Sequence, residues 1–169
     1  MAPAYLYQAP NGVPGDITRT DETNVEPAML VAVSTVYAQA FGIPMKYQTG
    51  GISQIEASDA ATVFAGILVR EVPSISGNTD QTFTGNIPNP DQVQGLAVRG
   101  YVSVKCVAGT PARGGVVYMQ VTAHSGAVVG DLRADGTDSG NAVALTLAQA
   151  SWASDGVDSD LNAEIRIAR

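Results

Sequence analysis

Turn signals recur about every ten residues in the second half of the chain, and this spacing limits the possible folds most strongly. Turn residues such as glycine, proline, asparagine, aspartate and serine occur in 108–115, 124–126 and 135–141. The runs between them are apolar and rich in valine, which favours extended structure. Short strands at this spacing, separated by turn residues, are typical of all-β sandwiches and barrels.

Individual strands can be placed on this pattern. Residues 95–107 form one long extended run, the segment 108–115 turns, and Val116 to Val121 run extended again, so we predict a hairpin between the two runs. Alternation within a strand places Val102, Val104 and Cys106 on one face, and Ile165 and Ile167 share a face in the last strand. Cys106 is interpreted as a small buried hydrophobic residue, and Trp152 as a core or interface anchor.

The chain has 169 residues, of which 45% are hydrophobic and 15% charged, which suits one domain with a sizeable core. We divide it into an extended N-terminal arm and lead-in segment, residues 1–45, and a β-sandwich domain, residues 46–169. Little helix is expected. A short helical turn is predicted near residue 60, with Ser58 or Asp59 as its N-cap.

The N-terminal arm carries an apolar patch. Two prolines and two glycines in QAPNGVPGD prevent regular structure at residues 8–16. Tyr5, Leu6 and Tyr7 precede this stretch and would be adhesive if exposed, so they should dock either on the chain's own sheet or on a neighbouring molecule. The sequence favours neither. The candidate partner-contact residues are Tyr5, Leu6, Tyr7, Val13 and Ile17.

Charge excludes two classes of partner. The formal net charge is −7, from 9 basic and 16 acidic residues, and no basic cluster is present. Such a chain is repelled by nucleic-acid phosphates and by anionic membrane surfaces. No apolar run reaches membrane-spanning length, and the N-terminus lacks the basic and apolar regions of a secretory signal. We therefore expect a protein made and assembled in a cytoplasm.

Residues suited to catalysis are scarce. His124 and Cys106 are the single histidine and the single cysteine, and no GxSxG stretch surrounds a serine. No enzyme activity and no cofactor are expected. The acidic stretch Asp155–Glu164 offers clustered oxygen atoms for calcium, but the order of its residues does not match an EF-hand. A solvated acidic turn is favoured over a cation site there, and no metal site is predicted.

Five stretches taken in order resemble the structural cement proteins that decorate the heads of tailed bacteriophages. They are YLYQAPNGVPGDITRTDETNVEPAML, FAGILVREVPS, NIPNPDQVQGLAVRGYVSVKC, GTPARGGVVYMQV and ASWASDGVDSDLNAEIRI. The resemblance covers nearly the whole chain. It implies a jelly-roll-like β-sandwich on the outer surface of the capsid, and it brings no catalytic residues with it.

The resemblance also implies partners. The major capsid protein lattice would be bound and neighbouring capsomers clamped, with this chain acting as a small oligomer, a homodimer first and a trimer second. The alternative is a carbohydrate-binding jelly-roll module for host adhesion. That alternative needs an exposed aromatic platform or a calcium site, and only 6% of the residues are aromatic.

Overall fold

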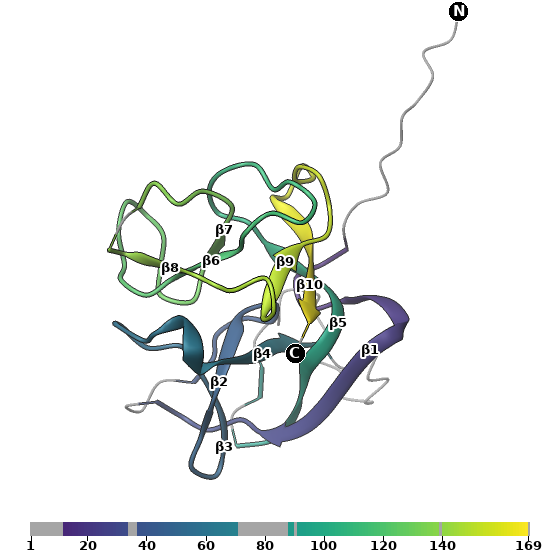
Figure 1. The fold of residues 1–169 in the computed structure, drawn as a ribbon. Coiled ribbons are helices and arrows are strands. Elements are labelled where there is room, and N and C mark those ends of the chain that lie inside the picture. The colour runs from purple at the N-terminus through teal and green to yellow at the C-terminus, as the bar shows by residue number, and fades with distance from the viewer. Residues whose placement is uncertain (1–11, 34–36, 71–87, 90, 139, 169) are drawn as a thin grey trace, which may run out of the picture.

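The computed structural model describes residues 12–33, 37–70, 88–89, 91–138 and 140–168, and these are nearly all β (Figure 1). The helical structure described is one short 3₁₀ turn, η1, Ala61–Val63. The all-β prediction is confirmed. The strands are β1 Ile17–Met29, β2 Pro44–Gln48, β3 Gly51–Gln54, β4 Phe64–Val69, β5 Val93–Lys105, β6 Tyr118–Gln120, β7 Leu132–Arg133, β8 Ala142–Ala144, β9 Ala150–Trp152 and β10 Asn162–Ala168.

Strand β5 organises the larger of two antiparallel sheets. In the described residues this sheet has seven strands in the order β3-β2-β4-β5-β10-β9, and β1 also pairs with β5. Strand β1 runs along one edge of β5, whereas the other edge is shared, β4 pairing with its first half and β10 with its second. Gly100 lies in the part of β5 that pairs with β10, close to where β4 gives way to it, with φ +116°.

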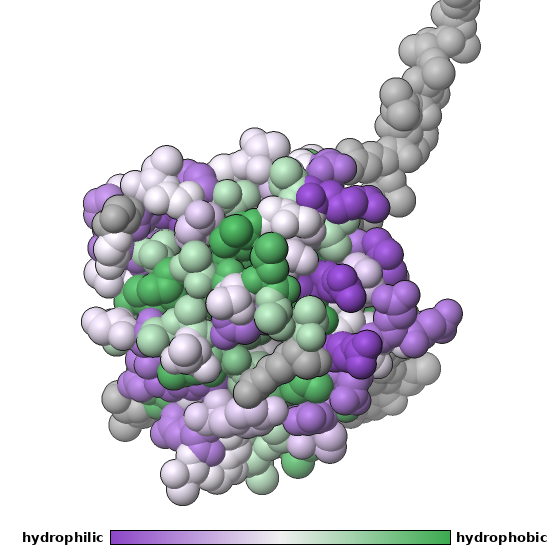
Figure 2. Space-filling view, viewed as in Figure 1, coloured by the Kyte–Doolittle hydropathy of each residue, from purple (hydrophilic) through white to green (hydrophobic). Residues whose placement is uncertain are grey.

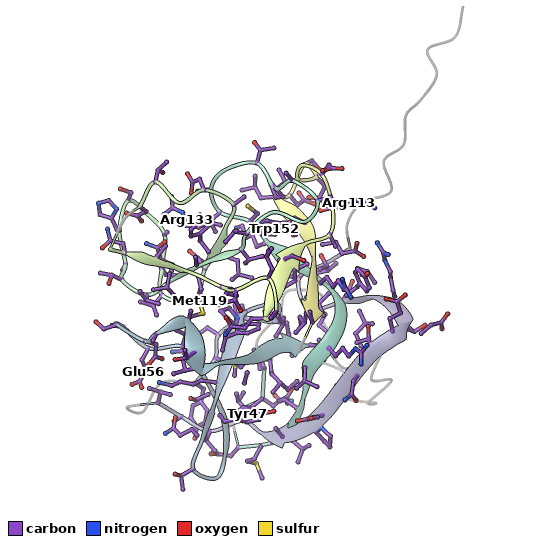
Figure 3. The ribbon with its side chains drawn as sticks, in the orientation of Figure 1. Tyr47, Glu56, Arg113, Met119, Arg133 and Trp152 are labelled. Carbon is purple, nitrogen blue, oxygen red and sulfur yellow. The ribbon has the colours of Figure 1, made fainter. Side chains whose placement is uncertain are left out.

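A three-stranded sheet, β7-β6-β8, covers one face of the larger sheet and encloses the main core. Val102, Val104, Cys106, Ile165 and Ile167 all lie in this core, and so does Trp152, which is 1% exposed (Figure 3). A second cluster lies on the opposite face, where Leu30 and Met45 pack with Leu96 and Leu68. This two-sheet arrangement is compatible with a jelly-roll-like sandwich, whose detailed connectivity stays a prediction.

The predicted hairpin between residues 95–107 and 116–121 is wrong. Strand β6 pairs with β7 and β8 and not with β5. Beyond β5 the chain continues instead beside β7, because Val107 N donates to Leu132 O (2.9 Å) and Ala134 N donates to Ala108 O (2.8 Å). The segment 108–115 therefore carries the chain from one sheet to the other.

The predicted N-cap is also wrong. The residue that precedes η1 is Ala60, and no side chain caps the turn. Asp59 is used differently, because its carboxylate accepts hydrogen bonds from Glu56 N (2.8 Å) and Lys46 Nζ (2.8 Å). Near the N-terminus, residues 17–29 are part of β1 and pair with β5. The division of the chain at residue 45 stays a prediction.

Candidate functional site

The described chain begins with a tight turn that is firmly attached to the domain. Asp16 N donates to Val13 O (2.9 Å), and Gly15 has φ +92°, which suits the glycine of a Pro-Gly turn. Gly15 N donates to Ser103 O (2.8 Å), and Ser103 N donates to Asp16 O (2.9 Å). The turn that directly follows residues 1–11 is therefore fixed on strand β5.

Two of the five predicted contact residues lie within the described structure. Val13 is 46% exposed, whereas Ile17 is half-buried, pairs with Val102 and packs against the main core. Tyr5, Leu6 and Tyr7 lie outside the described residues. Of the described pair, Val13 is the residue that a partner could contact directly, and Ile17 helps to hold the start of β1.

Val13 borders a hollow of about 560 Å³. Its volume lies in the range of about 300–1,000 Å³ that ligand-binding clefts occupy. The wall is largely apolar, with acidic residues and one lysine beside it. Sequence reasoning missed most of this surface because its residues come from five separate segments: Gly12–Pro14, 40–43, Lys105, 130–132, and Asp158 with Asp160 and Asn162.

The acidic stretch near the C-terminus stabilises the fold. Asp158 Oδ1 accepts hydrogen bonds from Asp160 N (2.9 Å) and Asn162 N (2.8 Å), which closes the turn before β10. Glu164 is 9% exposed and accepts from Thr18 Oγ1 (2.5 Å) and Arg19 Nη2 (2.8 Å). These contacts join β10 to β1. Within the described residues, no three His, Cys, Asp or Glu side chains gather where they could hold a metal ion.

A buried polar network centres on Asp138. Asp138 Oδ2 accepts hydrogen bonds from Gln120 Nε2 (2.8 Å) and Arg133 Nη1 (2.6 Å), and Oδ1 accepts from Asn141 Nδ2 (2.8 Å). His124 Nδ1 lies 2.9 Å from the same carboxylate. The hydrogen bonds from Gln120 and Asn141, with the charges of His124 and Arg133, hold the pKa of Asp138 at about 2.

Ser125, His124 and Asp138 superficially resemble a catalytic triad. Ser125 Oγ lies 3.2 Å from His124 Nδ1 and 3.4 Å from Nε2. An oxygen nearly equidistant from both ring nitrogens is not aligned with the Nε2 lone pair, as a nucleophile activated by histidine must be. Nδ1, moreover, already faces Asp138. The histidine is an exposed, hydrogen-bonded loop residue.

The described structure thus defines an all-β protein whose polar clusters hold strands together. None of its described helical structure is long and apolar enough to span a membrane. These features are those of a structural or binding protein. The chain belongs to the structural cement protein family (E217 gp24/Pam3 gp6), whose model matches residues 1–168. It is therefore a structural phage protein with a capsid role.

A solved structure supports the fold. The chain is similar to a protein in the structure titled "The capsid of Myoviridae Phage XM1", with a TM-score of 0.66 and 18% sequence identity. The similarity covers 98% of this chain and 96% of that chain, so nearly the whole architecture is shared. No curated protein sequence matches the chain.

Proposed function

We propose that this protein binds the outer surface of the major capsid protein lattice and clamps neighbouring capsomers, which stabilises the phage head. The observation that carries the proposal is the match to the structural cement family over residues 1–168. A β-domain with two sheets packed around a core suits this role, since a clamp transmits load between the capsomers that it contacts. No enzyme activity, cofactor or nucleic acid takes part in it.

The N-terminal residues supply the clamp's apolar contact. Tyr5, Leu6 and Tyr7 lie a few residues before Val13, whose turn is bonded to β5. We propose that this aromatic segment docks on a neighbouring capsid subunit and not on the chain's own sheet. Large aromatic side chains with a polar end are common at the centres of protein interfaces.

Self-association strengthens the attachment. A homodimer, with a trimer as the second possibility, presents more than one contact to a repeating lattice, so modest affinity per copy gives tight overall binding. The net charge of −7 keeps free copies soluble and gives no attraction to packaged DNA. The protein is made and assembled in the host cytoplasm.

Deleting residues 1–11 tests the arm. A longer deletion to residue 24 would remove the first part of β1 and with it the ion pair between Arg19 and Glu164. We expect the short deletion to retain the β-sheet circular dichroism spectrum and the thermal midpoint. It should no longer bind expanded heads, and should therefore stay in the supernatant when the heads are pelleted. The triple variant Y5S/L6S/Y7S should behave in the same way, with Q8A as the matched control.

Two results would contradict the proposal at different levels. Normal decoration of heads by the deletion variant would show that the arm is not the contact. If the full-length protein fails to bind mature or expanded heads, the capsid-binding function itself is wrong.

The carbohydrate-binding alternative finds little support among the described residues. Tyr47 is 51% exposed, whereas the other aromatic residues in the described part of the chain are buried or half-buried. Its hydroxyl donates to Glu26 Oε2 (3.0 Å) (Figure 3 shows its position). A glycan array with and without EDTA tests this alternative, and clear binding would favour it over capsid attachment.

A further inference from the structure

Strand β1 contains a fixed bulge that presents two carboxylates. Arg19 pairs with Tyr101 and Asn24 pairs with Arg99, so four residues of β1, 20–23, stand opposite Gly100 alone. Asp21 and Glu22 in this segment are exposed. Bulges of this kind redirect side chains at the edge of a sheet.

The bulge is held in place by its last residue. Thr23 Oγ1 donates to Arg19 O (2.6 Å) and accepts from Tyr101 N (3.3 Å). Gly100 makes room for this threonine, because a Cβ on Gly100 would lie 2.3 Å from Thr23 Oγ1. The two carboxylates are therefore displayed by a built feature of the sheet.

A hollow of about 420 Å³ lies beside the bulge. Asp21 and Glu22 line it together with Arg99, Tyr101 and Arg166. In the antiparallel ladder, Arg166 lies opposite Tyr101 and Ala168 lies opposite Arg99, so both arginines share the face of Tyr101. Figure 2 shows hydrophilic residues gathered along this side of the molecule, where Figure 1 places β1, β5 and β10.

The two arginines differ in their contacts from three other cations of the described chain. Arg19, Lys46 and Arg133 each form an ion pair of 2.8 Å or shorter. Within the described residues, the side chains of Arg99 and Arg166 form no ion pair or hydrogen bond, although two carboxylates line the same hollow. An acidic protein thus keeps two adjacent exposed arginines available.

We propose that this surface binds a second copy of the chain about a two-fold axis, with Asp21 and Glu22 of each copy facing Arg99 and Arg166 of the other. A two-fold interface brings the same patch of both copies together, and it requires each patch to complement itself. Adjacent groups of opposite sign satisfy this requirement. A uniformly acidic or basic partner would meet a like charge on one half of the surface.

The inference rests on the proposed self-association and assigns it a surface. Charge reversal tests it in the full-length protein. Variant D21K/E22K makes the surface wholly basic, and R99E/R166E makes it wholly acidic, so each alone should lose the dimer, with Kd raised at least about tenfold by repulsion between like charges. Sedimentation velocity at low and high salt measures the oligomeric state, and R113E, an exposed site outside the hollow, is the matched control.

Restoration makes the test specific. A one-to-one mixture of the two reversed variants should form heterodimers, because both contacts then join opposite charges. The fourfold variant that carries all four reversals should dimerise with itself. The inference is overturned if the wild type is monomeric, if the reversed variants remain dimeric, or if neither the mixture nor the fourfold variant restores association.

Head binding is measured separately for the same variants. Loss of the dimer with retained, weaker binding to heads supports the inference and leaves the capsid function intact. Dimers that persist in every reversed variant overturn the inference alone. Failure of the wild type to bind heads contradicts the proposed function, whatever its oligomeric state.

Discussion

Asp138 shows how a single side chain couples the smaller sheet to pH. Its side chain is 8% exposed and accepts hydrogen bonds from Gln120, Asn141 and Arg133. Its pKa of about 2 lies below the value of about 3.9 for an aspartate in an unfolded chain. A depressed folded-state pKa stabilises the fold above the unfolded value, and this contribution is lost as pH falls from about 5 towards 2.

Replacing this carboxylate should therefore matter more at neutral pH than in acid. We expect Asp138→Asn to lower the free energy of unfolding at pH 7 and to flatten its dependence on pH between 5 and 2. Urea unfolding at pH 7 and at pH 3 measures both effects, with the exposed Asp160→Asn as the control. An equal loss of stability at the two pH values would show that the carboxylate's charge does not act in this way.

The sequence could not identify this network. DGTDSGN reads as a polar turn, and nothing local distinguishes Asp138 from Asp135. Its main partners, Gln120 and Arg133, come from β6 and β7. By contrast, the burial of Val102, Val104 and Cys106 follows from alternation within one strand, so the local sequence was sufficient to predict it.

At the level of elements, the sequence predicts strands better than it predicts their partners. The long extended run expected from residue 95 onward is confirmed as part of β5, but the predicted hairpin with residues 116–121 is wrong. Turn residues favour a reversal of the chain, whereas the backbone of residues 107–108 is satisfied by β7 and its extension. The same limit applies to the hollow beside Val13, which is assembled from segments far apart in sequence.

Gly100 of β5 lies opposite the bulge in β1, and a side chain added at this position should disturb the bulge more than one added elsewhere. Ala at Gly100 must adopt φ +116° and place a Cβ 2.4 Å from Thr23 Cα. Gly114 is a matched control, since its φ is +76° and a Cβ there would meet nothing within 4 Å. We expect Gly114→Ala to cost about 1–2 kcal/mol for the backbone conformation alone. Gly100→Ala should cost a further ~1–3 kcal/mol from overpacking.

Chemical denaturation of the two variants checks this difference. Gly100→Ala should also weaken the proposed dimer, because displacing Thr23 moves Asp21 and Glu22. Equal losses of stability in the two variants would mean that β1 relaxes away from β5 without cost, and that the bulge is not a rigid feature.

At the scale of the whole molecule, β5 joins two cores. Neighbouring residues of this strand face opposite ways, with Leu96 in the smaller cluster and Ala97 in the main core. Opening either cluster exposes the same strand, which favours cooperative unfolding of the described domain. Cys106, just beyond the end of β5 and 2% exposed, lies where it can report this event.

Burial raises the pKa of the Cys106 thiol, so both its access and its thiolate fraction are reduced in the folded protein. We expect a thiol reagent at pH 8 to label native protein slowly, at a rate that rises with urea as global unfolding does.

A partner that binds only the folded state stabilises it by about 2.7 kcal/mol at a hundredfold excess over Kd, so saturating heads should slow labelling about 100-fold. Leu147→Cys, at an exposed site, controls for reagent access on the particle. Labelling of Cys106 that is fast and independent of urea would instead indicate local opening at the end of β5, and an unchanged rate on decorated heads would show that attachment does not stabilise the domain.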